Sequence, residues 1–173
     1  MIPEILTARL RLRGHRLEDF PSSAAMWADR DVTRFIGGRP LSEEEAWARF
    51  LRYAGHWSIM SFGYWAVEER DGGAFIGEVG FANFKREIDP AIRDIPEVGW
   101  VLVRSVHGRG YATEAVAAAL VWARTNLAAQ STTCLIHPEN LASIRVADKC
   151  GFNWSREAVY KNEPVVIYTR KIV

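Results

Sequence analysis

The sequence predicts a domain of mixed α/β structure, in the α+β class. Its central sheet should be mixed but mostly antiparallel, with about seven strands, and flanked by helices. Three observations support this prediction. Alternating segments follow one another at 64–69, 74–84 and 97–103, and three successive strands of this kind form a meander. A long alanine-rich helix is expected at 110–127. A short strand, a helix and a hairpin then complete the chain.

Before the meander, the sequence predicts one strand followed by helical segments. Residues 10–13, Leu-Arg-Leu-Arg, have the two-residue period of a strand with one solvated face. We expect a short helix at 18–28 and a further helical turn at 29–36, which ends at two glycines. The sequence Ser-Glu-Glu-Glu at 42–45 is a capping box that opens a helix. The apolar stripe of this helix, expected to lie mostly in the core, comprises Trp47, Phe50, Leu51, Ala54 and Trp57.

From residue 71 onward, turn residues mark where the predicted strands and helices begin and end. Asp-Gly-Gly at 71–73 supplies the turn that an antiparallel hairpin requires. The helix at 110–127 has a face of small residues, which lets a helix approach a sheet closely. This face comprises Ala112, Ala115, Val116, Ala119, Leu120 and Ala123. A strand at 132–136, a helix at 140–150 closed by Gly151, and a hairpin of 154–160 with 165–172 follow.

Length and composition narrow the function classes. With 173 residues, the chain is expected to form one domain, 1–173, with a core of its own. The 22 basic and 21 acidic residues nearly cancel and form no basic stripe, so nucleic acid is not an expected partner. The longest apolar run, 115–123, has only nine residues, and the N-terminus has no apolar signal core. We therefore expect no membrane segment and a cytoplasmic location.

The two cysteines, Cys134 and Cys150, lack CxxC spacing and neighbouring histidines. Cysteines in this setting are typically buried, reduced thiols. The sequence therefore predicts neither a disulfide nor a metal site.

The turn Gly108-Arg109-Gly110 separates a strand from the alanine-rich helix, an order that suggests a phosphate cradle. A helix that begins at a turn presents unpaired N–H groups and the positive end of its dipole, which can hold a pyrophosphate. The glycines would let the phosphate approach closely. A dinucleotide-binding motif is excluded, because Thr113 replaces its third glycine and Gln130 stands where an acidic residue is expected.

The residues around this turn resemble a known family. The order is strand, HGRGYA at 107–112, helix, strand, Asn140, helix and Gly-Phe at 151–152, which resembles the GNAT superfamily of acetyl-CoA-dependent N-acetyltransferases. The stretches GRGYATEA and NLASIRVADKCGF are most similar to the branch with the ribosomal-protein acetyltransferases RimJ and RimL. The resemblance is strongest over 75–152. It implies acetyl-CoA as cosubstrate, no metal, and a small-molecule or peptide amine as acceptor; we expect a monomer or homodimer.

The resemblance also implies a cosubstrate path. The pantetheine arm would pair with the backbone of the strand at 101–103, and the pyrophosphate would sit on the N–H groups of 108–113. Asn140 would bond the pantetheine or cap its helix. The cosubstrate-binding residues expected are Val101, Leu102, Val103, Gly108, Arg109, Gly110, Tyr111, Ala112, Thr113, Asn140 and Ser143. Family members begin the turn motif with Arg or Gln where this chain has His107.

Acetyl transfer requires a base, because primary amines are mostly protonated at neutral pH. Glu97, at the start of the strand that should line the acetyl group, is the first candidate, and many family members place an acidic base there. Glu78 on the neighbouring strand is the second. Strand alternation alone does not decide which carboxylate faces the cleft. The carbonyl oxygen should meet a backbone N–H of the strand at 100–103.

The departing thiolate needs a proton donor. Many family members have a tyrosine four residues before the glycine of Gly-Phe, but this chain has Ala147 there. The resemblance to the Rim branch implies that Ser143, three residues after the asparagine, serves instead, and Tyr160 is a further substitute. The missing tyrosine favours an alternative, a non-catalytic acyl-CoA-binding regulatory module, whereas Glu97 and Ser143 favour the enzyme.

Acceptor recognition is expected from the N-terminal helices and the strand edges. The candidate residues are Trp27, Arg34, Phe35, Trp57, Phe62 and Trp65. The near-neutral net charge disfavours strongly cationic acceptors.

Overall fold

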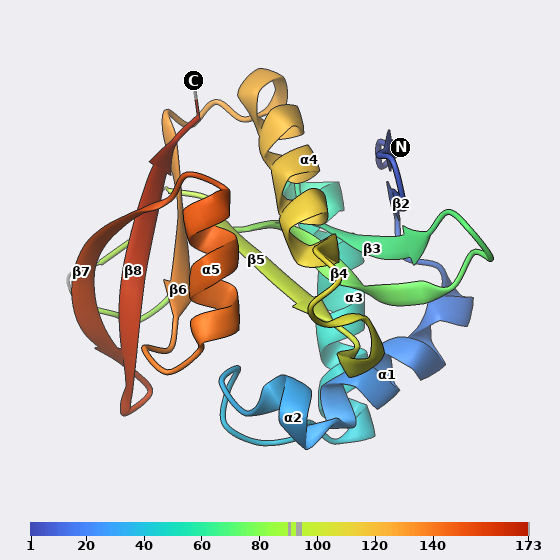
Figure 1. Ribbon diagram of the computed structural model, residues 1–173, viewed down its shortest axis with the longest axis horizontal. Helices are drawn as coiled ribbons and strands as arrows, with labels where there is room; N and C mark the ends of the chain where they lie inside the picture. Colours follow the sequence, from blue (N-terminus) through green and yellow to red (C-terminus); the bar gives the residue numbers. More distant parts are fainter. Residues whose placement is uncertain (90, 93–94, 173) are drawn as a thin grey trace.

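The computed structural model describes residues 1–89, 91–92 and 95–172. Within these ranges the chain forms one eight-stranded sheet in the order β1-β2-β3-β4-β5-β6-β8-β7 (Figure 1). The strands are β1 Ile5–Leu6, β2 Leu10–Arg13, β3 Tyr64–Glu69, β4 Phe75–Ala82, β5 Glu97–Leu102, β6 Ser131–Ile136, β7 Asn153–Tyr160 and β8 Glu163–Lys171. Neighbouring strands are antiparallel except β5 and β6. The predicted mixed sheet is confirmed, and the strand that the prediction missed is the two-residue β1.

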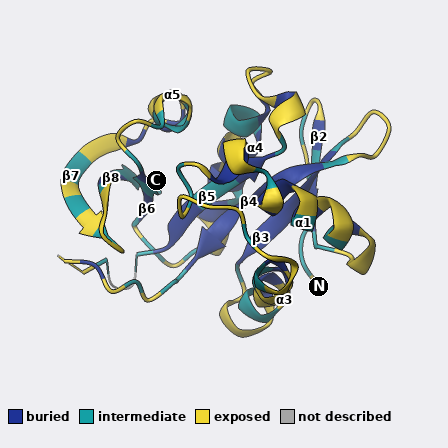
Figure 2. Ribbon diagram, turned by 90° about the horizontal axis from the view of Figure 1, so that it is seen from below, coloured by how far each residue is buried: buried dark blue, intermediate teal, exposed yellow. Residues whose placement is uncertain are grey.

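Helices cover both faces of the sheet. They are α1 Phe20–Ala28, α2 Arg30–Thr33, α3 Glu43–Met60, α4 Tyr111–Asn126 and α5 Leu141–Lys149, with 3-10 turns at Leu17–Asp19 and Arg104–Val106. The buried strands β3 and β4 lie between α4 on one side and α1 and α3 on the other (Figure 2). No helix in the described part of the chain has the length and apolarity needed to cross a membrane.

The helix α3 begins as the capping box predicts. Ser42 Oγ accepts a hydrogen bond from the Glu45 N–H at 3.2 Å, and a Glu45 carboxylate oxygen accepts one from the Ser42 N–H at 2.8 Å. These two bonds satisfy amide groups that a helix start leaves unpaired.

The predicted apolar stripe of α3 is wrong in part. Phe50 and Trp57 are buried as expected, but Trp47, Leu51 and Ala54 are exposed. The buried face consists of Ala46, Phe50, Tyr53 and Trp57. Tyr53 lies on this face because its hydroxyl donates to the buried carboxylate of Glu78 at 2.6 Å, which offsets the cost of burying a polar group.

The small-residue face of α4 is confirmed. Its buried residues are Tyr111, Ala115, Val116, Ala119, Leu120 and Ala123, whereas Ala112 is half-buried. Cys134 and Cys150 are free and buried, as predicted. Burial raises the pKa of both thiols above the ordinary value, so both are expected to react slowly.

The side chains of β5 alternate between the two faces of the sheet. Val98 and Leu102 belong to the large core that includes α4, whereas Val101 packs with Met26 and Trp27 of α1. Because alternate side chains of a strand share a face, Glu97 faces the same side as Val101. That side is covered by α1 and α3.

The strands β5 and β6 diverge after a single parallel pair. This pair joins Glu97 to Thr133, whereas β5 pairs with β4 along its whole length, from Glu97 to Leu102. Figure 1 shows β5 turning away from β6 beyond the pair. One edge of β5 therefore has no strand partner among the described residues, and its backbone groups other than the Leu102 carbonyl, which His107 contacts, are available to a ligand.

Candidate active site

A cavity of ≈ 590 Å³ lies where β5 and β6 diverge. Its walls come from β5, β6, α3, the loop before α3, the start of α5 and the end of β7. Four residues predicted for catalysis or cosubstrate binding line it: Glu97, Val101, Asn140 and Ser143. Tyr160, the substitute acid, lines it as well. The fold thus brings residues from three separate segments to one hollow.

Glu97 is held in the cavity wall by Arg86. The Arg86 guanidinium donates to both carboxylate oxygens of Glu97, each at 2.6 Å. Burial would lower the pKa of Arg86, but the bonds to Glu97 raise it above the ordinary value. A carboxylate oxygen keeps further lone pairs when it accepts one bond. The pairing therefore orients Glu97 in the cavity wall and leaves lone pairs that can accept further hydrogen bonds.

Tyr64 lies against the backbone of β5 beside Glu97. A Cβ atom at Gly99 would come within 2.0 Å of Tyr64 Oη, so only glycine fits there. Burial, followed by the negative charge of Glu97, raises the pKa of Tyr64, and the phenol stays protonated. The sequence analysis did not select Tyr64 for the site, although a glycine inside a strand indicates close approach by another group.

Glu78 is fully buried, and the cavity lining does not include it. Its carboxylate accepts hydrogen bonds from Ser23 Oγ at 2.6 Å, Trp27 Nε1 at 3.1 Å and Tyr53 Oη at 2.6 Å. Burial would raise the pKa of Glu78, but His15, 3.7 Å away, and the hydroxyl donors lower it below the ordinary value. Glu78 therefore joins α1 and α3 to β4.

The start of α4 offers free backbone amides. Gly108 and Gly110 have φ angles of 78° and 80°, in the left-handed region that favours glycine. No side chain caps the helix. The N–H groups of residues 108–113 donate no hydrogen bond to any described residue. This is the arrangement that binds anions at a helix start.

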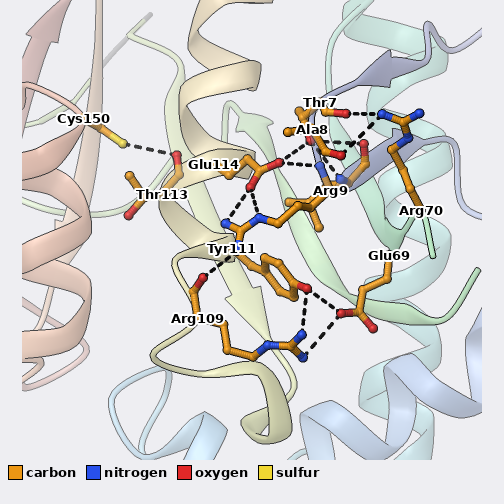
Figure 3. Close-up of polar contacts among 11 residues, drawn as sticks. Thr7, Ala8, Arg9, Glu69, Arg70, Arg109, Tyr111, Thr113, Glu114 and Cys150 are labelled. Carbon is orange, nitrogen blue, oxygen red and sulfur yellow. Dashed lines mark hydrogen bonds and ion pairs between the residues drawn. The ribbon is translucent and has the colours of Figure 1, made fainter. Parts of the chain in front are cut away.

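A clamp of three residues fixes this helix start (Figure 3). Glu114, in the first turn of α4, accepts hydrogen bonds from Thr7 Oγ1 at 2.6 Å, from the Arg9 N–H at 2.9 Å and from Arg9 Nε at 2.7 Å. Burial would raise the pKa of Glu114, but these donors lower it. The sequence analysis missed the clamp, because Glu114 is more than 100 positions from Thr7 and Arg9 in the sequence.

The side chains of the glycine turn are engaged elsewhere. Tyr111 Oη donates to Glu69 at 2.7 Å, and Arg109 donates to Tyr111 Oη at 3.0 Å and lies 3.4 Å from Glu69 (Figure 3). Arg104 forms an ion pair with Asp31. These contacts leave the backbone, rather than the side chains, as the binding element of the turn.

The three residues predicted to pair with pantetheine have different surroundings. Val101 lines the cavity, and Leu102 packs into the core beneath α4. His107 Nε2 lies 2.9 Å from the Leu102 carbonyl oxygen, which ties the glycine turn to the strand. The Val103 N–H donates to the Ile76 oxygen at 2.9 Å, just beyond the end of β5.

Asn140 and Ser143 meet at the start of α5. Asn140 Oδ1 accepts a hydrogen bond from the Ser143 N–H at 3.1 Å, which caps the helix as one predicted role requires. The Ser143 hydroxyl forms no hydrogen bond with a described residue and lines the cavity. Ala147, where the family tyrosine would stand, is fully buried.

The predicted acceptor residues divide into two groups. Trp27 and Phe35 line the cavity, and Arg34 lies 4.9 Å from the Phe35 ring centroid. Trp57 and Trp65 are buried in the large core, against which Phe62 packs. The lining residues that the sequence analysis missed include Tyr64, Arg86, Arg49 and Arg52.

Comparisons with known proteins identify the family. Residues 9–153 match the model of the acetyltransferase (GNAT) domain. The uncharacterized protein YkkB of Bacillus subtilis is 28% identical over 172 residues, which cover 97% of this chain and 95% of YkkB. The crystal structure of an acetyltransferase from Agrobacterium tumefaciens has a TM-score of 0.85 at 27% identity, covering 98% of this chain and 95% of that one.

A third comparison shows the same fold at lower identity. The structure of RimL, the ribosomal L7/L12 acetyltransferase solved in complex with coenzyme A, has a TM-score of 0.78 at 16% identity and covers 98% of both chains. The family match spans most of the chain and agrees with the motifs at 107–112 and 140–152. The chain therefore belongs to the GNAT acetyltransferase family and is an N-acetyltransferase.

Proposed function

We propose that the chain transfers an acetyl group from acetyl-CoA directly to the primary amine of a small molecule or peptide. One combination of observations carries the proposal: the start of α4 has free amides, β5 has an edge without a strand partner, and the cavity beside that edge is lined by Glu97 and Ser143. Acetyl-CoA supplies an acyl group activated as a thioester.

The described residues fit coenzyme A. The amides of 108–113 suit a pyrophosphate, because they are unpaired and lie at the positive end of the α4 dipole. The open edge of β5, beyond the Glu97–Thr133 pair, suits the amide groups of an extended pantetheine arm. RimL, which has the same fold, was solved in complex with coenzyme A, and this supports coenzyme A as the ligand.

We assign the base to Glu97. It lines the cavity, whereas Glu78 is fully buried with its oxygens engaged by donors from α1 and α3. Glu97 would accept the proton of the ammonium group, directly or through water, while Arg86 holds its carboxylate in place. Glu78 is then a positioning residue, because it fixes Trp27 in the cavity wall.

The reaction also requires stabilisation of the carbonyl oxygen and a proton for the departing sulfur. Backbone N–H groups on the open edge of β5 would stabilise negative charge on the carbonyl oxygen. The Ser143 hydroxyl would protonate the departing sulfur, since it lines the cavity without a partner among the described residues. Thiols have pKa values of about 8.5, so this proton contributes modestly to the rate.

The cradle is tested by calorimetric titration of coenzyme A. Gly110→Asp is expected to weaken binding at least about tenfold while circular dichroism stays unchanged, because it adds a negative charge where a phosphate would bind. Gly72→Asp is the matched control: Gly72 has a similar φ of 89° but lies in the β3–β4 turn. Equal affinities in the wild type and the Gly110 variant would refute the cradle.

The base is tested by thiol release from acetyl-CoA with a panel of amines and N-terminal peptides. Glu97→Gln is expected to lower kcat at least about 100-fold, within the range of general-base contributions, with coenzyme A still bound. Unchanged turnover would refute the assignment of Glu97. Coenzyme A binding without turnover on any amine would favour a regulatory acyl-CoA-binding module.

A further inference from the structure

The cavity has a basic wall. Its cationic lining residues are Arg39, Arg49, Arg52, Arg86 and Lys161. Its two carboxylates are Glu45 and Glu97. Arg39 pairs with Glu45, and Arg86 pairs with Glu97. The carboxylates of the lining are therefore both used, and cationic groups remain.

Two of the remaining cations lie together on α3. Arg49 and Arg52 are three residues apart, so they are neighbours on the helix surface. Neither forms an ion pair or hydrogen bond with another side chain of the described residues. Arg49 lies 3.9 Å from the Trp27 ring centroid, and its Nε is buried without a hydrogen-bond partner. Arg52 lies 5.4 Å from the Phe84 ring centroid.

This arrangement is electrostatically unfavourable without an anion. Burial lowers the pKa of Arg52, and the positive charge of Arg49 lowers it further. Like charges at neighbouring helix positions repel, and the half-buried Arg49 also loses hydration. An oxyanion between them would remove both costs, and guanidinium groups bind carboxylate and phosphate oxygens in pairs.

The arginine pair lies on the same side of the sheet as Glu97, the proposed base that would face the acceptor amine. Arg49 and Arg52 belong to α3, whereas the phosphate cradle belongs to α4 on the other face of the sheet (Figure 2). Glu97 faces the α3 side, and its charge and that of Arg49 both act on the phenol of Tyr64. The proposed base and the two arginines thus line one end of the same cavity.

We propose that the acceptor is an anionic amine, whose carboxylate or phosphate group is bound by Arg49 and Arg52 while its amine faces Glu97. The inference rests on the proposed function and names the substrate class of that site. It agrees with the sequence argument against strongly cationic acceptors.

The test uses three matched acceptor pairs that differ in charge. They are 3-aminopropanoate with 3-aminopropanamide, 2-aminoethyl phosphate with 2-aminoethanol, and C-terminally amidated Ser-Asp with C-terminally amidated Ser-Asn. We expect kcat/KM to be at least about tenfold higher for the anionic member of at least one pair, a ratio worth about 1.4 kcal/mol. The pair that responds distinguishes a carboxylate, a phosphate and an acidic peptide.

The variants locate this preference. Arg49→Gln and Arg52→Gln, singly and together, are expected to bring the ratio close to one while the coenzyme A dissociation constant stays within about twofold. Arg124→Gln is the control, because Arg124 is exposed on α4 and does not line the cavity, and its ratio should equal that of the wild type. Circular dichroism checks folding, and Arg52→Gln alone suffices if the loss of the Arg49 stacking on Trp27 unfolds the chain.

Calorimetry separates this inference from the proposed function. The acceptors are titrated into protein with and without coenzyme A, so binding is measured even where no turnover occurs. Binding of the anionic members that both variants abolish supports the inference. Equal binding and turnover of charged and neutral members would overturn it and leave acetyl transfer standing. A loss of coenzyme A affinity in the arginine variants would also overturn it, because the pair would then bind the cosubstrate.

Discussion

Gly99 lies where β5 touches Tyr64, and Gly99→Ala is expected to destabilise the protein. The new Cβ would lie 2.0 Å from Tyr64 Oη and 3.2 Å from Tyr64 Cζ. Ordinary contacts between heavy atoms are about 3.5 Å or longer, so the phenol would have to move by roughly 1.5 Å. Overpacking of this kind costs about 1–3 kcal/mol. Alanine recovers about 0.5–1 kcal/mol over glycine in a strand, so the net loss should lie near the middle of a range of about 0–2.5 kcal/mol, at roughly 1 kcal/mol.

Tyr64→Phe should relieve the clash, because it removes the oxygen atom that meets the new Cβ. The Tyr64 hydroxyl has no hydrogen bond to another described residue, so Tyr64→Phe alone should cost little. The double variant should recover most of the lost stability, with a coupling free energy of about 1–2 kcal/mol. Urea unfolding of the wild type, the two single variants and the double variant, monitored by circular dichroism, measures this coupling free energy.

Gly55→Ala provides the control for the Gly99 experiment. Gly55 lies inside α3, and a Cβ there would meet no atom within 4 Å. This variant should be more stable than the wild type by about 0.5–1 kcal/mol. The steric argument fails if Gly99→Ala is as stable as the wild type, or if the double variant is no more stable than Gly99→Ala.

Three further predictions concern a buried carboxylate, a helix cap and a buried thiol. Glu78→Ala should lower the free energy of unfolding by about 3–5 kcal/mol, because it leaves buried donors unpaired; a loss below about 1 kcal/mol would contradict the buried network. Since the folded pKa of Glu78 lies below the ordinary value of 4.5, its contribution holds above that pH and is lost as the pH falls through the folded pKa. The fall in stability below pH 4.5 should therefore be shallower in Glu78→Gln, as acid unfolding curves can show. Ser42→Ala should cost about 1 kcal/mol in urea unfolding through loss of the helix cap, and an unchanged midpoint would count against it. Cys134, with a raised pKa and 1% exposure, should react with a thiol reagent only when the chain unfolds, so rapid labelling under native conditions would show that the site opens.

Most of the secondary structure could be predicted because its signals are local. The Ser42 capping box, the glycines before α4 and the turn between β3 and β4 act within a few residues, and the structure contains all three. The stripe of α3 was less predictable. Periodicity identifies an apolar face but carries no information about the buried acceptor of the Tyr53 hydroxyl. The helix lies with Tyr53 facing the core, and Trp47 is therefore exposed.

In the candidate site, too, local features could be predicted from the sequence and long-range contacts could not. The sequence by itself determined the strand, glycine turn and helix whose free amides suit a phosphate, because φ angles and helix ends depend on neighbouring residues. Only the tertiary structure decided that β5 and β6 diverge, that Arg86 holds Glu97 in the opening, and that Glu78 is fully buried instead. These outcomes depend on contacts between segments distant along the chain. A carboxylate on either strand looks the same in sequence, and packing alone determines which one reaches the cavity.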